Sequence, residues 1–293
     1  MVRFPDGMRF ISNRKNTVPS FEVTSIYKGF SDHLLRMVAG FRYEELNTQE
    51  ARNFGAGVLD GPALPTTAGS LQNLTGTPFT FLDDHHRDIW SLAIQDEWQF
   101  AQDWHLTTGL RFDHYSDFGS TLNPRAALIW DINSELTGKI LYGQAYRAPS
   151  FVEQYQRNSP QFIGNSSLQP ETIETTELAF DYRPTTNLRT TLNLYYYKIK
   201  DLIGGEFITQ NAPLSETNLA GQSAYGSEFE WDWKFLPEWS LRGNYAWQYA
   251  RSEENQRRVS NVPEHHVYSA LAWNFMPKWQ IQTQINWLGH RLS

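Results

Sequence analysis

Large apolar side chains alternate with polar or charged ones over strand-length segments of this sequence. The clearest case is residues 222–236, QSAYGSEFEWDWKFL, where an aromatic ring occupies every second position from Phe229 to Phe235. The positions between these rings carry Glu228, Glu230, Asp232 and Lys234. Because successive side chains of an extended chain point to opposite sides, this segment predicts a strand with one very apolar and one charged face.

The same alternation recurs along the chain, for example at 90–100, 106–113, 239–249 and 279–287, with Asp96 interrupting one apolar face. About twelve such segments can be counted, most of them near the ~9–11 residues with which a tilted strand crosses a bilayer. No long stretch keeps the 3.6-residue period of a helix. The predicted fold class is therefore all-β, an antiparallel transmembrane β-barrel of which this chain forms a part.

Short and long connections separate the segments in turn. The short ones lie near residues 31, 102, 133, 185, 237 and 277, and the long ones span about 49–86, 149–172, 202–221 and 251–263, with a short exception at 116–121. Barrels of bacterial outer membranes have tight turns at the periplasmic end and long loops at the outer end. The asymmetry favours this class.

Three of the tight turns carry paired aromatic residues: FAQDW at 100–104, FLPEW at 235–239 and FMPKW at 275–279. Such rings suit the headgroup level of a bilayer, where an apolar body lies in lipid and a polar edge in water. The alternative is a soluble β-sandwich or propeller whose aromatic face is a buried core. That alternative gives no reason for paired rings at one end of the fold, so we favour the membrane barrel.

Composition excludes several other classes. The formal net charge of −7 disfavours nucleic acid as a partner, since a polyanion requires a basic patch. The absence of cysteine excludes disulfides and thiolate metal sites. The sequence has no run of about 18 apolar residues that would predict a transmembrane helix, and its start, MVRFPDGMRF, does not resemble a secretory signal.

Motifs in four successive segments resemble those of TonB-dependent outer-membrane receptors. They lie in LTTGLRFDHYSDFGSTLNPRAALIW at 106–130, LYGQAYRAPSFVEQY at 141–155, NSSLQPETIETTELAF at 165–180 and LNLYYYKIKDLI at 192–203. Each motif is weak by itself, but their shared order is specific, and the resemblance runs from about Leu34 to the end.

The resemblance implies a 22-stranded, monomeric barrel whose lumen is filled by an N-terminal plug, on which the TonB energising complex acts. Residues 1–293 then form a fragment of the barrel domain, without plug, first strands or last strands, because the final strand runs outward and no terminal aromatic residue follows it. We expect membrane lipid around this part of the barrel, and an outer-membrane location in a Gram-negative bacterium.

Candidate ligand-binding residues lie in two of the long connections. They are Arg147, Tyr155, Gln156, Arg157 and Phe162 in the first, and Arg251, Arg257 and Arg258 in the second. Guanidinium groups and rings suit an anionic or aromatic ligand, through charge and stacking. The competing interpretation is solvated surface, and for Arg147 we favour a structural role in which Pro149 ends the strand and the arginine pairs with a lumen carboxylate.

Two histidine pairs, His85–His86 and His265–His266, raise the possibility of a metal site. Adjacent residues of a strand face opposite sides and cannot chelate one ion without a turn, so we expect no metal site and no cofactor. No nucleophile has a local catalytic signature, so we expect no enzyme.

The resemblance implies active import of a small-molecule chelate, and a ferric siderophore is the substrate class we expect. Haem is disfavoured because residues 150–168 contain no histidine and the second motif reads Asn165, Ser166, Ser167, Leu168. Cobalamin or another non-iron ligand stays open. So do a passive porin-like channel and a purely structural barrel.

Overall fold

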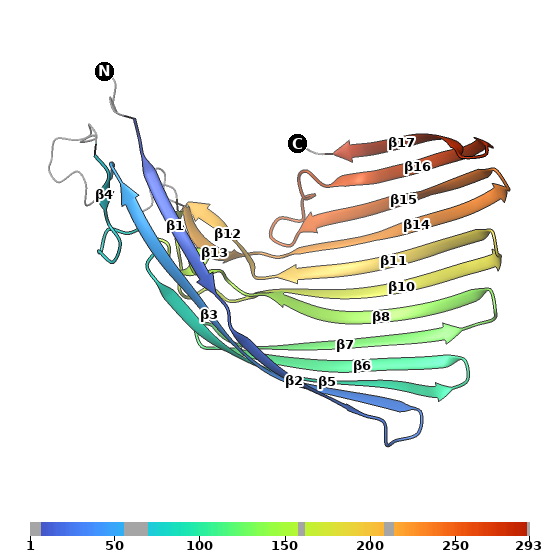
Figure 1. The fold of residues 1–293 in the computed structure, drawn as a ribbon, viewed down its shortest axis with the longest axis horizontal. Coiled ribbons are helices and arrows are strands. Elements are labelled where there is room, and N and C mark those ends of the chain that lie inside the picture. The colour runs from blue at the N-terminus through green and yellow to red at the C-terminus, as the bar shows by residue number, and fades with distance from the viewer. Residues whose placement is uncertain (1–6, 56–69, 158–161, 208–213, 292–293) are drawn as a thin grey trace.

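The structure of the chain, a computed structural model, describes residues 7–55, 70–157, 162–207 and 214–291. Most of them belong to one antiparallel sheet (Figure 1). Its strands are β1 (Phe10–Thr17), β2 (Ser20–Tyr27), β3 (His33–Arg52), β4 (Gln72–Asn73), β5 (His85–Ala101), β6 (Trp104–Tyr115), β7 (Gly119–Asp131), β8 (Leu136–Arg147), β10 (Glu171–Thr185), β11 (Leu188–Lys200), β14 (Gln222–Leu236), β15 (Trp239–Ser252), β16 (Pro263–Met276) and β17 (Trp279–Arg291).

Twelve of these strands follow one another in the order β1-β3-β5-β6-β7-β8-β10-β11-β14-β15-β16-β17, which confirms the predicted number and the antiparallel arrangement. β1 and β2 pair with the two halves of the long strand β3 and are separated by Val18 and Pro19. Proline has no N–H to donate to a ladder, so the interruption falls where pairing is weakest. The Pro19 carbonyl still accepts a hydrogen bond from the Tyr43 N–H at 3.0 Å.

The tight turns and the long connections lie at opposite ends of the sheet, at the right and left of Figure 1 respectively. Two residues separate β5 from β6, β14 from β15, and β16 from β17. The paired rings of these turns are in contact, with ring centroids 6.0 Å apart for Phe100 and Trp104 and 6.2 Å for Phe235 and Trp239. The predicted grouping of aromatic residues at one end of the sheet is thus present.

Several strands are longer than a membrane crossing requires. β3 has 20 residues and β5 has 17, against the ~9–11 predicted for most segments. On the outward face of this pair, the exposed apolar residues extend to Trp90, which faces Phe41, and the next two facing pairs on that side are Tyr43–Asp88 and Glu45–His86. The ladder therefore continues past the apolar band into a polar region, which a pattern of apolar residues alone could not predict.

The long connections contain more regular structure than expected. Residues 149–172 include the short helix α1 (Phe151–Tyr155) and β9 (Phe162–Ile163). Residues 202–221 form the hairpin of β12 (Leu202–Phe207) and β13 (Leu214–Leu219), and β13 pairs in parallel with β9. In the part of the chain that is described, no helix is long and apolar enough to cross a membrane.

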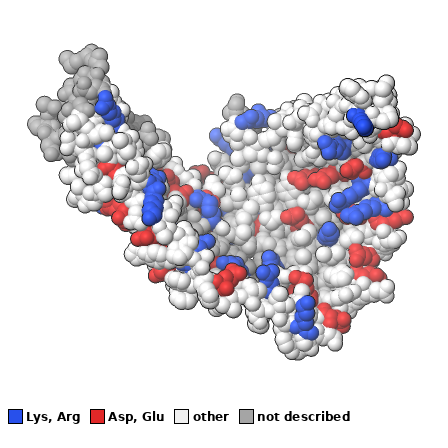
Figure 2. Space-filling view, in the orientation of Figure 1, with Lys and Arg blue, Asp and Glu red and all other residues white. Residues whose placement is uncertain are grey.

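The two faces of the sheet differ as the alternation predicts. On the face defined as outward, large apolar side chains are exposed, including Trp90, Leu92, Ile94, Phe229 and Trp233. The opposite, inner face carries the charged residues, and Figure 2 shows acidic and basic side chains gathered over β10–β17. A sheet with an exposed apolar face and a charged inner face matches a barrel that has lipid outside and a polar lumen inside.

Candidate functional surface on the inner face and at the loop end

Charged side chains of the inner face pair across and along strands. Asp181 accepts hydrogen bonds from Arg183 at 2.8 Å and from Arg189, on the neighbouring strand, at 2.7 Å. Arg111 donates two hydrogen bonds to the buried Asp113, at 2.8 and 2.6 Å. Unlike charges on the inner wall thus pair within strands and, between Asp181 and Arg189, across neighbouring strands.

Arg147 lies at the loop end of β8 and contacts two carboxylates. Its Nε is 2.7 Å from Glu171 Oε2, and its Nη1 is 3.0 Å from both carboxylate oxygens of Glu153. Glu153 also caps α1: its carboxylate accepts from the Ser150 N–H, while the Ser150 hydroxyl accepts from the Glu153 N–H. Arg147 therefore ties the end of the strand to the helix, as the structural interpretation expects, and a ligand would have to compete with two carboxylates.

Tyr155 and Arg157 join their connection to the preceding long connection. The Tyr155 ring stacks on His85 with centroids 4.0 Å apart, and the Arg157 guanidinium pairs with Asp83. The Arg157 N–H also donates to the Phe81 carbonyl at 2.7 Å. Burial lowers the pKa of His85 below its ordinary value, an effect to which nearby Arg157 adds. These contacts favour a neutral imidazole and a docked pair of loops.

The other two candidates of this connection are Gln156 and Phe162. The Gln156 backbone closes α1 by donating to the Val152 carbonyl, and its own carbonyl accepts from the Gly164 N–H at 2.7 Å. Phe162, in β9, keeps 38% of its surface exposed. Of the five candidates in this connection, Arg157, Arg147 and Phe162 are exposed, at 46%, 45% and 38%, whereas Tyr155 and Gln156 are half-buried.

Arg251 lies near the end of β15, contrary to its predicted place in the connection, whereas Arg257 and Arg258 belong to the connection between β15 and β16. Arg258 pairs with Glu264 and lies over the Tyr249 ring at 5.0 Å, and Arg251 Nε donates to the Ser223 hydroxyl at 3.3 Å. The Arg257 side chain is exposed and has no ion pair with another described residue. Arg257 is thus the candidate of this group best placed to meet an anion from solvent.

One residue that organises the loop end was not among the predicted candidates. Arg87 is 9% exposed, donates to Glu44 at 2.7 Å and to the Pro149 carbonyl at 2.9 Å, and lies over the rings of Tyr115 and Phe151. It thereby connects β3, β6 and the start of the 149–172 connection through one guanidinium. The only signal in the sequence was its place on the polar side of the alternation; its pairing with Glu44 depends on the strand register.

The adjacent histidines face opposite sides. His85 stacks on Tyr155, whereas His86 lies against Tyr43 with ring centroids 5.9 Å apart. His266 contacts Asn286 at 2.8 Å, and His265 contacts the Tyr245 hydroxyl at 2.8 Å. Neither pair has the geometry to chelate one ion, and among the described residues no group of three metal-binding side chains is present.

Comparison with known proteins identifies a family and several relatives. A family model described as "TonB dependent receptor-like, beta-barrel" matches residues 3–292. The chain is 24% identical, over 243 residues, to the iron-regulated outer membrane virulence protein of Vibrio cholerae. This alignment covers 76% of the chain and 37% of that protein. It is 35% identical, over 131 residues, to the vitamin B12 transporter BtuB of the same species, covering 44% and 20% respectively.

A solved structure shares the fold. The siderophore receptor PirA of Pseudomonas aeruginosa superimposes with a TM-score of 0.69 and 20% identity, over 94% of this chain and 46% of that one. At this identity the likeness concerns the fold alone. The chain spans about a third of the length of the first of these curated relatives and under half of the PirA chain.

Proposed function

Because the chain belongs to the TonB-dependent receptor-like β-barrel family, we propose that it forms part of the wall of an outer-membrane receptor that imports a ferric siderophore. The observation that carries the proposal is the two-faced sheet, whose apolar outward face suits lipid and whose charged inner face suits a polar lumen. The outer-membrane location, the action of TonB through a plug domain and the monomeric state belong to the same proposal.

The loop end of the sheet provides the groups for initial capture of the ligand. Exposed guanidinium groups of Arg257 and Arg157 attract an anionic chelate, and the exposed ring of Phe162 offers a stacking surface. Passage through the lumen then requires rearrangement of a plug driven by TonB. In this scheme the described residues bind and guide, and they carry out no chemical step.

One comparison supports a siderophore over cobalamin. The match to the iron-regulated protein of Vibrio cholerae covers 76% of this chain, whereas the match to the vitamin B12 transporter covers 44% of it. That shorter match has the higher identity, 35%, so cobalamin is the second candidate substrate.

The proposal is tested by uptake of radiolabelled iron in the parent bacterium, supplied as a panel of catecholate, hydroxamate and carboxylate siderophores. We expect deletion of the gene, or of tonB, to abolish uptake of at least one complex, and the restored full-length gene to recover it. Uptake of every complex that is unchanged by both deletions would refute the siderophore proposal. Loss of labelled cobalamin uptake instead would select the second candidate.

A conductance measurement separates the receptor from a passive channel. The full-length protein in a planar bilayer should stay nearly closed, since a plug fills the lumen of a receptor of this type. A large open conductance without an energy source would favour a porin-like channel instead.

A further inference from the structure

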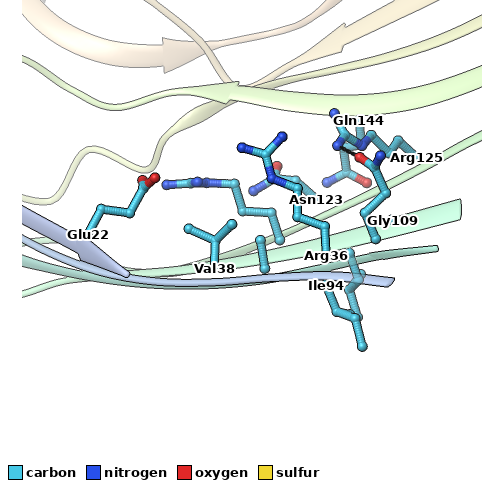
Figure 3. A pocket seen from close by; sticks show the side chains of 12 residues that line it. Glu22, Arg36, Val38, Ile94, Gly109, Asn123, Arg125 and Gln144 are labelled. Carbon is cyan, nitrogen blue, oxygen red and sulfur yellow. Dashed lines mark hydrogen bonds between the residues drawn. The ribbon is translucent and has the colours of Figure 1, made fainter. Parts of the chain in front are cut away.

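A hollow of about 350 Å³ lies on the inner face of the sheet at the level of β3, β5, β6 and β7 (Figure 3). The polar side chains that line it include Glu22, Arg36, Gln95, Arg111, Asn123 and Arg125. Three of these six are arginines from three different strands. Such a concentration of guanidinium groups in one cavity calls for a physical account.

The strand register builds the hollow from two rows of facing residues. Arg36, Gln95, Gly109 and Arg125 form one row across β3, β5, β6 and β7, and Val38, Ala93, Arg111 and Asn123 form the next. Facing residues of neighbouring strands share a side of the sheet, and strands are ~4.8 Å apart, so Arg36 and Arg125 stand about 14 Å apart at their Cα atoms. Long arginine side chains reach inward over that span from both ends.

Gly109 gives Arg125 its direction. A Cβ atom at Gly109 would lie 2.9 Å from Arg125 Nε, so the guanidinium passes directly over this glycine. From there Arg125 Nη2 donates to Gln95 Oε1, on the strand beyond. The floor of the hollow is formed by small residues, Val38, Ala93 and Gly109, and Figure 3 shows Arg36 and Arg125 extending over it.

The charge in the hollow is unbalanced. Arg111 is neutralised by its two hydrogen bonds to Asp113, whereas the one side-chain partner of Arg125 among the described residues is the neutral amide of Gln95, which itself donates to Glu97 at 2.7 Å. Arg36 forms no ion pair with any described residue, and Glu22, the one carboxylate among the lining residues, lies beyond ion-pairing distance of the arginines. A second hollow on the same face is lined by Arg189 and Arg242 together with Glu230 and Asp232, and is balanced.

Asn123 provides an independent observation. Its side chain is 8% exposed and lines the hollow; Nδ2 donates to the Thr121 hydroxyl at 3.1 Å, whereas the buried Oδ1 accepts no hydrogen bond from a described residue. A buried acceptor without a donor costs free energy, so such groups are normally satisfied by a partner or by water. The hollow thus presents two unneutralised cations beside one acceptor.

We propose that this hollow is a binding site for a carboxylate-bearing group that also carries a hydrogen-bond donor. Arg36 and Arg125 hold the carboxylate through the planar donor arrays that suit it, and Asn123 Oδ1 accepts from a hydroxyl or N–H of the same group. Two sources share this chemistry: a free hydroxycarboxylate in the lumen, and an acidic residue with its backbone N–H on a polypeptide segment that enters the lumen. The site requires neither transport nor TonB.

The test uses the purified full-length protein in detergent, with citrate as the free hydroxycarboxylate probe. Calorimetric titration and the thermal unfolding midpoint are measured for the wild type, for the double variant Arg36→Gln/Arg125→Gln, and for Arg242→Gln as the control from the balanced hollow. If the group is a free solute, citrate binds and raises the wild-type midpoint. The double variant then weakens binding at least tenfold, and Arg242→Gln changes it less than twofold.

If the carboxylate belongs to the polypeptide, citrate does not bind and the double variant lowers the midpoint by several degrees more than Arg242→Gln does. Simple removal of two unneutralised like charges would relieve repulsion and could not produce this fall. Asn123→Asp places a carboxylate beside the arginines, so it should abolish citrate binding in the first case and compete with the segment, also lowering the midpoint, in the second. Absence of citrate binding together with an unchanged midpoint in all variants would overturn the proposal.

Discussion

The part of the sheet within the apolar band and the part beyond it are held together in different ways. Within the band, around β10, β11 and β14, backbone ladders join the strands, and most large side chains are exposed on one face or the other. Beyond it, around the loop ends of β3 and β5, Arg87, Glu50 and Arg52 are buried and make ion pairs and ring contacts. The first region depends on its surroundings for stability, whereas the second has a polar core of its own.

This difference separates anchoring from ligand capture. A band whose apolar residues face outward is stable only where lipid replaces water. The loop end, by contrast, can keep a defined shape in water, because Arg87, Glu50 and Arg52 are paired and buried there. A receptor needs such a shape where it meets its ligand, and variants in the two regions should therefore fail in different ways.

The largest effect is expected from Arg87→Met, which removes the guanidinium shared by Glu44, Asp117 and the Pro149 carbonyl. Breaking a buried ion pair leaves an uncompensated charge and costs about 3–5 kcal/mol. The free energy of unfolding in urea, measured on the full-length protein in lipid vesicles, checks this value.

Arg42→Met is the matched control, because Arg42 pairs with the same Glu44 at 3.0 Å but has 44% of its side chain exposed. An exposed pair contributes about 0–1 kcal/mol. Equal losses from the two variants would contradict a buried polar core at the loop end.

An intermediate effect is expected from Leu192→Arg, on the outward face of β11 opposite Phe229. A charged residue on the lipid face near mid-membrane costs about 2–4 kcal/mol. The neighbouring inner-face substitution Thr191→Arg, opposite Glu230, should change the free energy of unfolding much less. Reversal of this order would place lipid on the other face.

A small effect of pH is expected at the loop end. Burial lowers the pKa of His85 below its ordinary value near 6.5, so the undocked loops bind a proton more readily than the docked ones. The stabilisation is complete above about pH 6.5 and decreases as the pH falls below that value towards the pKa of docked His85. The protection factor of the Arg157 amide, which donates to Phe81, should therefore fall between pH 7.5 and 5.5 when observed exchange is divided by the intrinsic rate at each pH.

The variant His85→Gln should remove most of this pH dependence, and an imidazole NMR titration should give a pKa below 6.5 for His85 in the native protein. An equal fall of the protection factor in the wild type and the variant would assign the pH effect to another group.

The sequence was sufficient to predict most strands of the main sheet, their antiparallel arrangement and their two faces. A strand's periodicity is local, so Phe229 to Phe235 reveal their face without knowledge of any other segment. The alternation of short and long connections likewise followed from distances along the chain. The opposite orientations of His85 and His86 are a consequence of the same two-residue period.

Contacts between segments far apart in the sequence could not be predicted from this local periodicity. Asp96, which interrupts an apolar face, pairs with His33 at 2.8 Å, a residue 63 positions away whose ring stacks on Trp98. The role of Arg87 depends on Pro149, 62 positions away. Arg125 was not predicted as a site residue because the alternation of apolar and polar residues near it is irregular. The direction of its side chain depends on Gly109, on the neighbouring strand.

The central claim is that the outward face of the sheet meets lipid and the inner face meets an aqueous or protein-filled lumen. Because the chain contains no cysteine, single cysteines for nitroxide labels can be placed at residues 228–233 of β14 without a background. In vesicles of the full-length protein, collisions with oxygen should be most frequent at 229, 231 and 233, and least frequent at 228, 230 and 232. A polar nickel complex should not reach the labels at positions 229, 231 and 233. Uniform oxygen access along the strand, or nickel access at Phe229, Trp231 and Trp233, would contradict the account.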